Sequence, residues 1–323
     1  MATTTTTTLA QEQASKPRLY AGLLPAVSSA AAFGLSGSLA RSLLDLGWSP
    51  GAVVAARVGG AFLLLVLPCL MLLRRVGLPS GRQAGRILAF GLVAVALAQF
   101  CYFSSVQYLS IGVALLLEYL APVLLIGWHW ARSRRRPANR VFVGAGVAVT
   151  GLVLVLDLTG PVTLNPIGVA WGLGAAACLC AYFVLSEEGG SEAPVHPLIL
   201  TTAGTGVSGL VILLAGMAGV LPLSASTGQV VVAGRAVSWL VPITLLILVA
   251  GVFAYLTGIT AIRMLGSSVA SFVSLSEVVF AVIFAALLLA QHPSATQLLG
   301  GALILVGIAV VQRDDARRSV NVR

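Results

Sequence analysis

Ten long apolar stretches fill most of this chain and constrain its fold more than any other feature. Each is close to the ~20 residues that cross a bilayer as a helix. Only 9% of the residues are charged and the mean hydropathy is +1.01, whereas a soluble globular domain carries about 25% charged residues. The chain therefore needs lipid as its main solvent. The stretches lie at about 19–41, 51–73, 84–106, 110–131, 140–159, 165–185, 197–221, 237–257, 265–290 and 295–312.

The apolar runs are continuous rather than alternating, which indicates membrane-spanning helices instead of a β-barrel. A secreted protein with one signal peptide is excluded because apolar stretches continue to residue 312. We expect an all-α polytopic membrane protein with ten transmembrane helices. Residues 1–17, which include the Thr3–Thr8 run, are predicted to form a disordered tail, and residues 313–323 a cytoplasmic tail.

Basic residues gather on one side of the predicted topology. With a cytoplasmic amino terminus, 16 of the 19 Lys and Arg residues fall in cytoplasmic segments, and the others are Arg41, Arg57 and Arg235. The positive-inside rule then predicts that both termini are cytoplasmic, in a protein of the plasma membrane. One cytoplasmic loop, 186–196, departs from the pattern because it carries three Glu residues and no Lys or Arg. The net charge of +9 therefore reflects topology, and nucleic acid is not an expected partner.

The chain repeats itself with an offset of 156 residues. RPANRVFVGAGVAVTGLVLV lies on HPSATQLLGGALILVGIAVV without a gap. The paired positions include Pro137 and Pro293, Gly144 and Gly300, and Gly151 and Gly307. Each half holds five predicted helices, an odd number, so the second half enters the membrane from the opposite side. We predict two inverted five-helix repeats, residues 18–159 and 160–312, which is the architecture of many secondary transporters.

Two carboxylates interrupt the apolar stretches near mid-membrane: Glu118 in LLLEYLAPVLL and Glu277 in SLSEVVFAVIF. A charged side chain there costs roughly 2.5–3.5 kcal/mol on insertion scales, so it usually has a function. One interpretation is a group that binds substrate or carries protons between the repeats. The other is a protonated, hydrogen-bonded carboxyl that locks two helices together. The pair is only approximately symmetric, since the offset of 156 places Ala121 opposite Glu277.

Other polar and aromatic side chains at similar depth are candidates for the same path. Arg57 either extends to the outer interface or pairs with a carboxylate of the protein or of the substrate. Ser274 and Ser276 precede Glu277 and are placed to donate hydrogen bonds to it or to substrate. Pro122 lies four residues after the first carboxylate, and its missing N–H predicts a kink there. The remaining candidates, for which core or interface packing is the alternative, are Gln99, Tyr102, Tyr119, Trp171, Tyr182 and Tyr255.

Sequence patterns for enzymatic or metal chemistry are missing. The four cysteines lie in apolar stretches without a CxxC or Cys/His cluster, and the three His residues are widely separated. No Ser/His/Asp arrangement is recognisable. We expect no cofactor, no metal ion and no enzymatic activity. The predicted partners are the lipid bilayer, a small-molecule substrate and protons, and a homodimer stays open.

The segments YLSIGVALLLEYLAPV and HPSATQLLGGALILVGIAVV, in a chain of two five-helix halves, resemble the EamA-type permeases of the drug/metabolite transporter superfamily over about residues 19–312. FCYFSSVQYLSIGVALLLEYLAP is also similar to the homoserine/threonine exporters of that group. The resemblance implies export of amino acids or related small metabolites by alternating access with proton exchange. It also implies that Glu118 and Glu277 lie in or near a central cavity.

The sequence departs from this family at two places. Glu277 is followed by Val278 where Glu-Pro is usual, which weakens the expected kink, and Gln291 stands where an acidic residue is usual. If one glutamate carries protons, we predict Glu118, because Pro122 follows it as in the family pattern.

Three other functions stay open. A multidrug or sugar-phosphate carrier of the same superfamily is one, although a phosphate substrate would favour basic residues in the cavity and Arg57 is the one candidate. A membrane-embedded enzyme would need His/Asp clusters facing one side, and the sequence has no such pattern. A scaffold or sensor predicts that neither glutamate matters for any flux.

Overall fold

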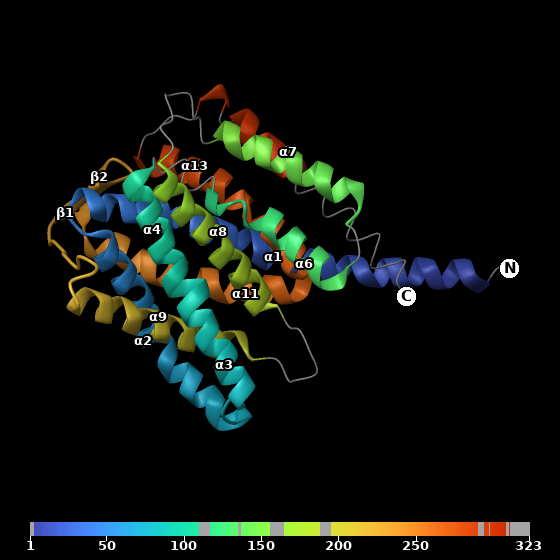
Figure 1. The fold of residues 1–323 in the computed structure, drawn as a ribbon, viewed down its shortest axis with the longest axis horizontal. Coiled ribbons are helices and arrows are strands. Elements are labelled where there is room, and N and C mark those ends of the chain that lie inside the picture. Colours follow the sequence, from blue (N-terminus) through green and yellow to red (C-terminus); the bar gives the residue numbers. More distant parts are fainter. Residues whose placement is uncertain are drawn as a thin grey trace.

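The computed structural model describes residues 3–109, 117–134, 137–155, 165–187, 195–289, 294–296, 298–307 and 310, with the backbone alone for residues 3–20, 103, 106, 107, 155 and 289. The chain folds into a bundle of helices (Figure 1). They are α1 (Thr3–Asp45), α2 (Pro50–Val76), α3 (Gly81–Ala89), η1 (Phe90–Leu97), α4 (Ala98–Tyr108), α6 (Ala121–Ser133), α7 (Asn139–Val155), α8 (Pro166–Ser186), α9 (Pro197–Met217), α10 (Leu240–Leu245), η2 (Leu246–Phe253), α11 (Ala254–Leu265), α12 (Ser267–Ser274) and α13 (Ser276–Leu289), with a further helix at Leu298–Gly307.

Seven of the described helical segments are long and apolar enough to cross a membrane. They agree in position with the first three and the sixth to ninth predicted stretches. The other three correspond to α6, α7 and Leu298–Gly307, and parts of them, including residues 110–116 and 156–159, lie outside the described residues. The helical membrane character is thus confirmed, while the count of ten helices stays a prediction. The seven segments are Ala21–Asp45, Pro50–Val76, Gly81–Tyr102, Pro166–Ser186, Pro197–Met217, Leu240–Leu265 and Ser267–Leu288.

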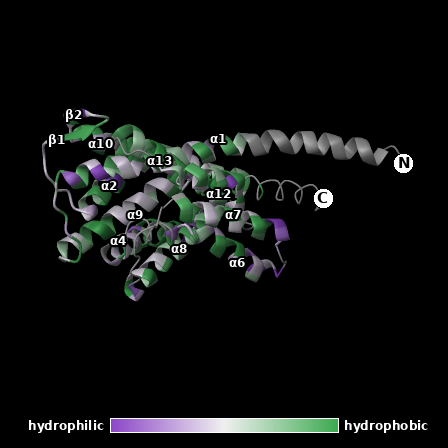
Figure 2. Ribbon diagram, turned by 90° about the horizontal axis from the view of Figure 1, so that it is seen from above, coloured by the Kyte–Doolittle hydropathy of each residue, from purple (hydrophilic) through white to green (hydrophobic). Residues whose placement is uncertain are grey.

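Large apolar side chains remain exposed along these helices, as expected where lipid is the solvent. Leu63 is 71% exposed, and Leu67, Leu210 and Leu287 are likewise at the surface. Figure 2 shows hydrophobic residues along most of the bundle and hydrophilic residues mainly near its ends. A monomeric soluble protein rarely exposes such continuous apolar surface.

Three helices begin at a polar cap followed directly by proline. The side chains of Ser49, Asn165 and His196 accept hydrogen bonds from main-chain N–H groups of α2, α8 and α9, at 3.2, 2.9 and 3.2 Å. Proline at the first helical position loses nothing, because that N–H has no partner within the helix. These caps place the three helix starts close to the predicted ones.

Two local features differ from the expectation. The eighth predicted helix was expected to end near residue 257, but α10, η2 and α11 run on as one helix to Leu265, so Arg263 lies in its last turn. Within the segment 222–236, expected to be a loop, and just beyond it, the antiparallel strands β1 (Gln229–Val232) and β2 (Arg235–Ser238) form a hairpin. β-branched valines favour the strands, and Ala233 and Gly234 take the positive φ of a tight two-residue turn.

The offset of 156 residues recurs in the backbone itself. The π-helical segments η1 and η2 have the same length, and both ends of η2 lie 156 residues after those of η1. Turns also interrupt the helices at equivalent positions, at Tyr119 in the first half and at Leu275 in the second. π-helical segments and helix breaks leave main-chain groups outside the regular ladder and often mark functional regions.

The two halves interlock instead of forming separate bodies. α1 opens the first half, yet it packs on α11, α12 and α13 of the second. α8 opens the second half and packs on η1, α4 and α6 of the first, while α2 and α9 pack on each other. The boundary near residue 160 therefore divides the sequence but not the fold.

The glycines that the repeat pairs also pack reciprocally, between α7 and the helix Leu298–Gly307 (side by side in Figure 1). A Cβ atom placed on Gly151 would lie 2.6 Å from the carbonyl oxygen of Gly300. A Cβ atom on Gly307 would lie 2.7 Å from the carbonyl oxygen of Gly144. Each contact is thus the 156-residue counterpart of the other, as in an interface with two-fold symmetry.

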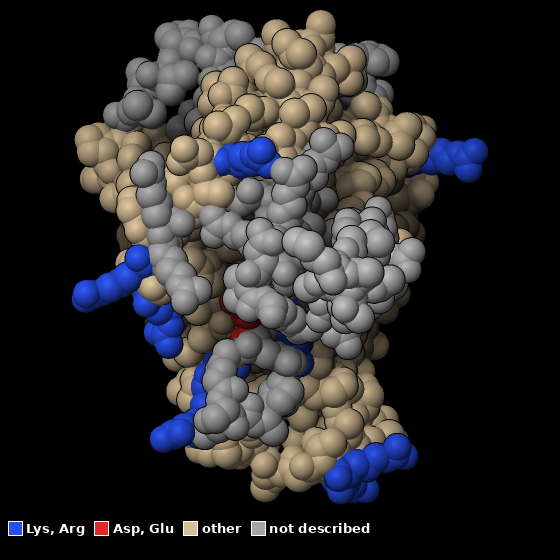
Figure 3. All heavy atoms as spheres, turned by 90° about the vertical axis from the view of Figure 1, so that its right-hand side faces the viewer, with Lys and Arg blue, Asp and Glu red and all other residues tan. Residues whose placement is uncertain are grey.

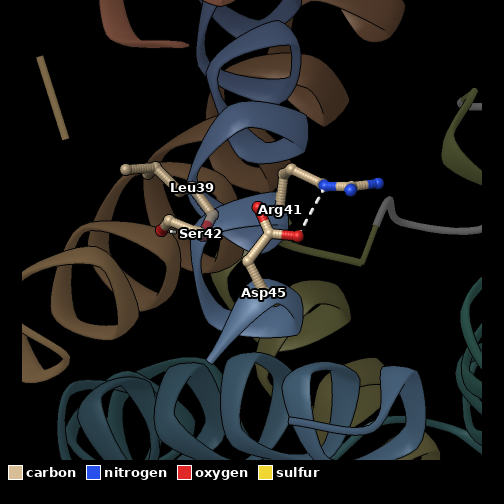
Figure 4. A network of polar contacts seen from close by, with 4 residues as sticks. All are labelled: Leu39, Arg41, Ser42 and Asp45. Carbon is tan, nitrogen blue, oxygen red and sulfur yellow. Dashed lines mark hydrogen bonds and ion pairs between the residues drawn. The ribbon is translucent and has the colours of Figure 1, made fainter. Parts of the chain in front are cut away.

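One end of the bundle, here called the hairpin end, joins α1 and α2 to residues 222–238. Nε1 of Trp48 donates to the carbonyl oxygen of Ser226 at 2.6 Å, and the hydroxyl of Ser49 donates to that of Pro222 at 2.7 Å. Arg41, one of the few basic residues expected outside the cytoplasm, forms an ion pair with Asp45 at 2.9 Å (Figure 4). Both partners are about half exposed, so this pair contributes little to stability.

Candidate functional site

Both intramembrane glutamates lie at helix breaks. Glu118 immediately precedes the turn at Tyr119 and Leu120, and α6 then begins with Pro122 in its first turn. Glu277 follows the equivalent turn at Leu275 and stands in the first turn of α13, where the helix dipole favours a negative charge. A two-residue turn therefore separates Glu118 from α6, at the place where Pro122 predicts a kink.

The break beside Glu277 forms without a proline, contrary to the expectation from Val278. The hydroxyls of Ser271, Ser274 and Ser276 donate to main-chain carbonyl oxygens three residues earlier, at 2.8, 2.7 and 2.6 Å. Such bonds compete with the main-chain ladder and bend helices. Because a hydroxyl has a single hydrogen, Ser274 and Ser276 donate to the backbone here rather than to Glu277.

Tyrosines surround the two carboxylates. The carboxylates of Glu118 and Glu277 are both half-buried and close enough to repel each other when charged. The buried hydroxyl of Tyr119 donates a hydrogen bond to Glu277. Tyr102 of α4 lies within electrostatic range of both glutamates, and Tyr182 of α8 within range of Glu277. Side chains from both halves thus meet at one place.

The side chain of Arg57 points into the bundle. It therefore does not extend to the outer interface, which was one of its two expected positions. Its Cζ lies 5.8 Å from the ring centroid of Phe33 and 5.9 Å from that of Tyr255, a cation–π arrangement. Its charge interacts favourably with Glu277. Tyr255 also contacts Tyr182, with ring centroids 6.2 Å apart. We call Arg57, Tyr102, Glu118, Tyr119, Tyr182, Tyr255 and Glu277, together with Phe33, the central cluster.

Two further predicted site residues lie on α8 and α4. Trp171 packs edge-on against Phe100, with centroids 5.4 Å apart, in a small core of α4 and α8 that Tyr102 of the cluster also lines. Gln99 is half-buried in α4. Pro122 is buried and serves to start α6. The structure therefore gathers seven of the twelve predicted residues and adds Phe33, which an apolar pattern alone does not distinguish.

A second polar network closes the opposite end of the bundle, here called the arginine end. The carboxylate of Glu187 accepts from the Ser267 hydroxyl at 2.6 Å, and His129 Nε2 lies 2.8 Å from the same hydroxyl. Arg86 donates to the carbonyl oxygens of Leu185 and Glu187. Figure 3 shows Arg side chains distributed over the face at this end, with acidic atoms near its centre.

This network was not singled out from the sequence. Arg263 extends it by donating to the carbonyl oxygens of Ser186 and Val195. It joins α3 and α6 of the first half to α8, α11 and α12 of the second. The available signal was the acidic 186–196 segment, whose charge opposes that of the other segments on this side.

A search of family models finds two matches that together cover most of the chain. The description "EamA-like transporter family" applies to residues 20–157 and again to residues 166–313. The chain belongs to the EamA-like transporter family. Two copies of the family domain account for the duplication in sequence and backbone, and the family is one of transporters.

Individual relatives agree with this family. The threonine/homoserine exporter RhtA of Escherichia coli is 30% identical over 156 residues, which cover 48% of this chain and 49% of the exporter. The chain thus spans about half the length of that curated relative in the match. The RhtA protein of Salmonella typhimurium is 28% identical over the same length. An uncharacterized inner membrane transporter of Salmonella typhimurium, YicL, is 22% identical over 243 residues, 75% of this chain and 77% of YicL.

A solved structure supports the fold. It superposes with a TM-score of 0.71, covers 90% of this chain and 98% of its own, and is 18% identical in sequence. At that identity the similarity establishes the fold and nothing about the substrate.

Proposed function

We propose that this EamA-family protein is a secondary active transporter that exports small metabolites, amino acids in particular, from the cytoplasm across the plasma membrane. It works by alternating access in exchange for protons. The observation that carries the proposal is the meeting of Glu118 and Glu277 at two helix breaks, one in each family domain. Transporters commonly build their substrate and ion sites from interrupted helices at the interface of two repeats.

The proposal includes ten helices in two inverted halves, 18–159 and 160–312, with cytoplasmic termini. The direction of equivalent helices supports it. α1 ends at the hairpin end, next to the Trp48–Ser226 contact, whereas α8 ends at the arginine end, where Leu185 accepts from Arg86. α9 leaves the arginine end at Pro197 and runs toward the hairpin end. The arginine end is the cytoplasmic side in this proposal.

Within the cluster we assign proton transfer to Glu118 and charge compensation to Glu277. Glu277 has Tyr119 as a hydrogen-bond donor, Arg57 as a nearby cation and the amino-terminal end of α13. Glu118 faces the negative charge of Glu277 instead. Two like charges in apolar surroundings repel, and a proton bound by Glu118 removes that repulsion. Release of the proton can then be coupled to solute binding.

Transport into inverted membrane vesicles with an imposed proton gradient tests this assignment. Glu118→Gln keeps the size of the side chain and removes its charge, so we expect gradient-driven uptake of threonine to fall at least tenfold while exchange of internal for external solute continues. Asp45→Asn, in the exposed ion pair of α1, is the matched control and should transport as wild type does. Gradient-driven transport by Glu118→Gln at the wild-type rate would refute the role of Glu118.

The aromatic wall of the cluster favours one second candidate, a carrier of larger amphipathic compounds. Phe33, Tyr182 and Tyr255 form a connected group, with ring centroids 5.2 and 6.2 Å apart. Such rings bind flat apolar solutes as well as small ones. A panel of amino acids and cationic aromatic dyes in the same vesicles distinguishes the two functions, because a multidrug carrier transports the dyes in preference.

A further inference from the structure

Two buried polar atoms of the central cluster have no hydrogen-bond partner among the described residues: Nε of Arg57 and the hydroxyl of Tyr182. Buried polar groups are nearly always hydrogen-bonded, and an unsatisfied one costs free energy. A guanidinium and a phenol both act as donors here. The cluster therefore presents two hydrogen-bond donors that lack an acceptor among the described residues.

The two donors are placed around the same side chains. The Arg57 guanidinium lies over the ring of Tyr255, at 5.9 Å, and the ring of Tyr182 contacts that same ring at 6.2 Å. Both Arg57 and Tyr182 are within electrostatic range of Glu277. Glu277 accepts from Tyr119, and the described residues form no ion pair between it and Arg57 at hydrogen-bonding distance. The charge of Glu277 is therefore nearby, but Glu277 accepts no hydrogen bond from Nε of Arg57 or from the hydroxyl of Tyr182.

The surroundings select the kind of acceptor. The rings of Phe33 and Tyr255 flank the guanidinium of Arg57. Because these rings contact its faces, the guanidinium can bind an acceptor only through the N–H groups at its edge. A planar carboxylate matches such a fork with two parallel hydrogen bonds. One cation beside two carboxylates suits a solute that carries both a carboxylate and a cationic group, whereas a phosphate dianion brings no positive charge to offset the two glutamates.

We propose that Arg57 and Tyr182 bind the carboxylate group of the transported solute, and that the facing glutamates bind its ammonium group. The site is thereby specific for a zwitterion, and each half of the chain contributes one residue to the binding of either charge. This inference rests on the proposed transport of amino acids and assigns the group that recognises them. It explains why Arg57 stands in the apolar part of α2, away from Arg74 and Arg75 of its last turn and beside two aromatic rings that hold it in place.

Binding of L-threonine and of its uncharged-end analogue L-threoninamide to the purified full chain in lipid nanodiscs tests the assignment. We expect wild type to bind threonine more tightly than threoninamide. Arg57→Gln should weaken threonine binding roughly 10- to 100-fold, the loss of charge-assisted hydrogen bonds, and leave threoninamide binding within about twofold. Tyr182→Phe should weaken threonine binding roughly 2- to 10-fold by the loss of one neutral hydrogen bond.

Arg41→Gln and Tyr108→Phe are the matched controls, because both side chains are exposed and lie outside the cluster. Threonine binding by Arg57→Gln at wild-type affinity would overturn the inference and leave the proposed function standing. Wild type that binds neither compound contradicts the proposed amino-acid substrate, and this inference with it. Should Arg57→Gln fail to fold, Tyr182→Phe decides alone, since equal losses for threonine and threoninamide would overturn the assignment.

Discussion

Gly34 of α1 packs closely against α13 at the central cluster. A Cβ atom placed there would lie 2.8 Å from the carbonyl oxygen of Glu277, 2.9 Å from Cβ of Phe280 and 3.0 Å from the main-chain nitrogen of Ala281. Two of these are backbone atoms of α13 and cannot move aside as a side chain does. Gly34→Ala therefore has to push α1 and α13 apart.

The loss of stability expected for Gly34→Ala follows from how far these distances fall below an ordinary contact. Ordinary contacts of a Cβ atom begin near 3.4 Å, so the helices must separate by several tenths of an ångström. Overpacking of this kind typically costs about 1–3 kcal/mol. The strain falls on the peptide of Glu277, so we also expect slower transport, because α13 positions that carboxylate.

Gly37 provides a control in the same helix, since a Cβ atom on it would meet nothing within 4 Å. Gly37→Ala should be neutral or stabilise the protein by up to about 1 kcal/mol through helix propensity. The free energy of unfolding is measured for both variants in mixed micelles titrated with a denaturing detergent. If Gly34→Ala proves as stable as Gly37→Ala, the close approach of α1 to α13 and the argument built on it are wrong.

Two further predictions concern the contacts between the halves. Gly151→Ala should destabilise the protein by about 1–3 kcal/mol, since the new Cβ would meet main-chain atoms of the facing helix. In the same unfolding titration Gly146→Ala should not destabilise the protein, because a Cβ atom on Gly146 meets nothing within 4 Å. Equal stability of the two variants would contradict the close packing at Gly151. Ser267→Ala removes the hydroxyl shared by Glu187 and His129, so hydrogen exchange in the first turn of α12 should accelerate roughly 5- to 20-fold, corresponding to about 1–2 kcal/mol; unchanged exchange would show that the arginine end is held by other contacts.

Much of the fold follows from the sequence because lipid imposes simple rules. A backbone in hydrocarbon must satisfy its own hydrogen bonds, so continuous apolar stretches predict helices, and the polar caps before Pro50, Pro166 and Pro197 locate their starts. The offset of 156 residues predicted the duplication that the family match bears out. It also holds for η1 and η2, which share the run Leu-Val-Ala at that offset.

The sequence predicted which residues belong to the candidate site better than it predicted how those residues are arranged. The cost of a carboxylate in apolar surroundings singled out Glu118 and Glu277, and Pro122 indicated the break beside the first. The break beside the second depends on three serine hydroxyls bonding back to the chain. The amino-acid sequence does not show whether a serine hydroxyl will bond to its own backbone or to another side chain. The acceptor is determined only when the backbone is folded around the hydroxyl.

Composition and spacing alone predict that this chain spans a membrane, is duplicated and carries costly charges at its centre. The packing of the whole bundle is what brings α1 of the first half onto the second half and α8 of the second half onto the first. It also turns Arg57 inward onto Phe33 and Tyr255. It also decided that Glu187 meets Ser267 across the two copies. Those outcomes depend on which helices lie side by side, and contacts between distant segments are selected by packing of the whole bundle rather than by any local pattern.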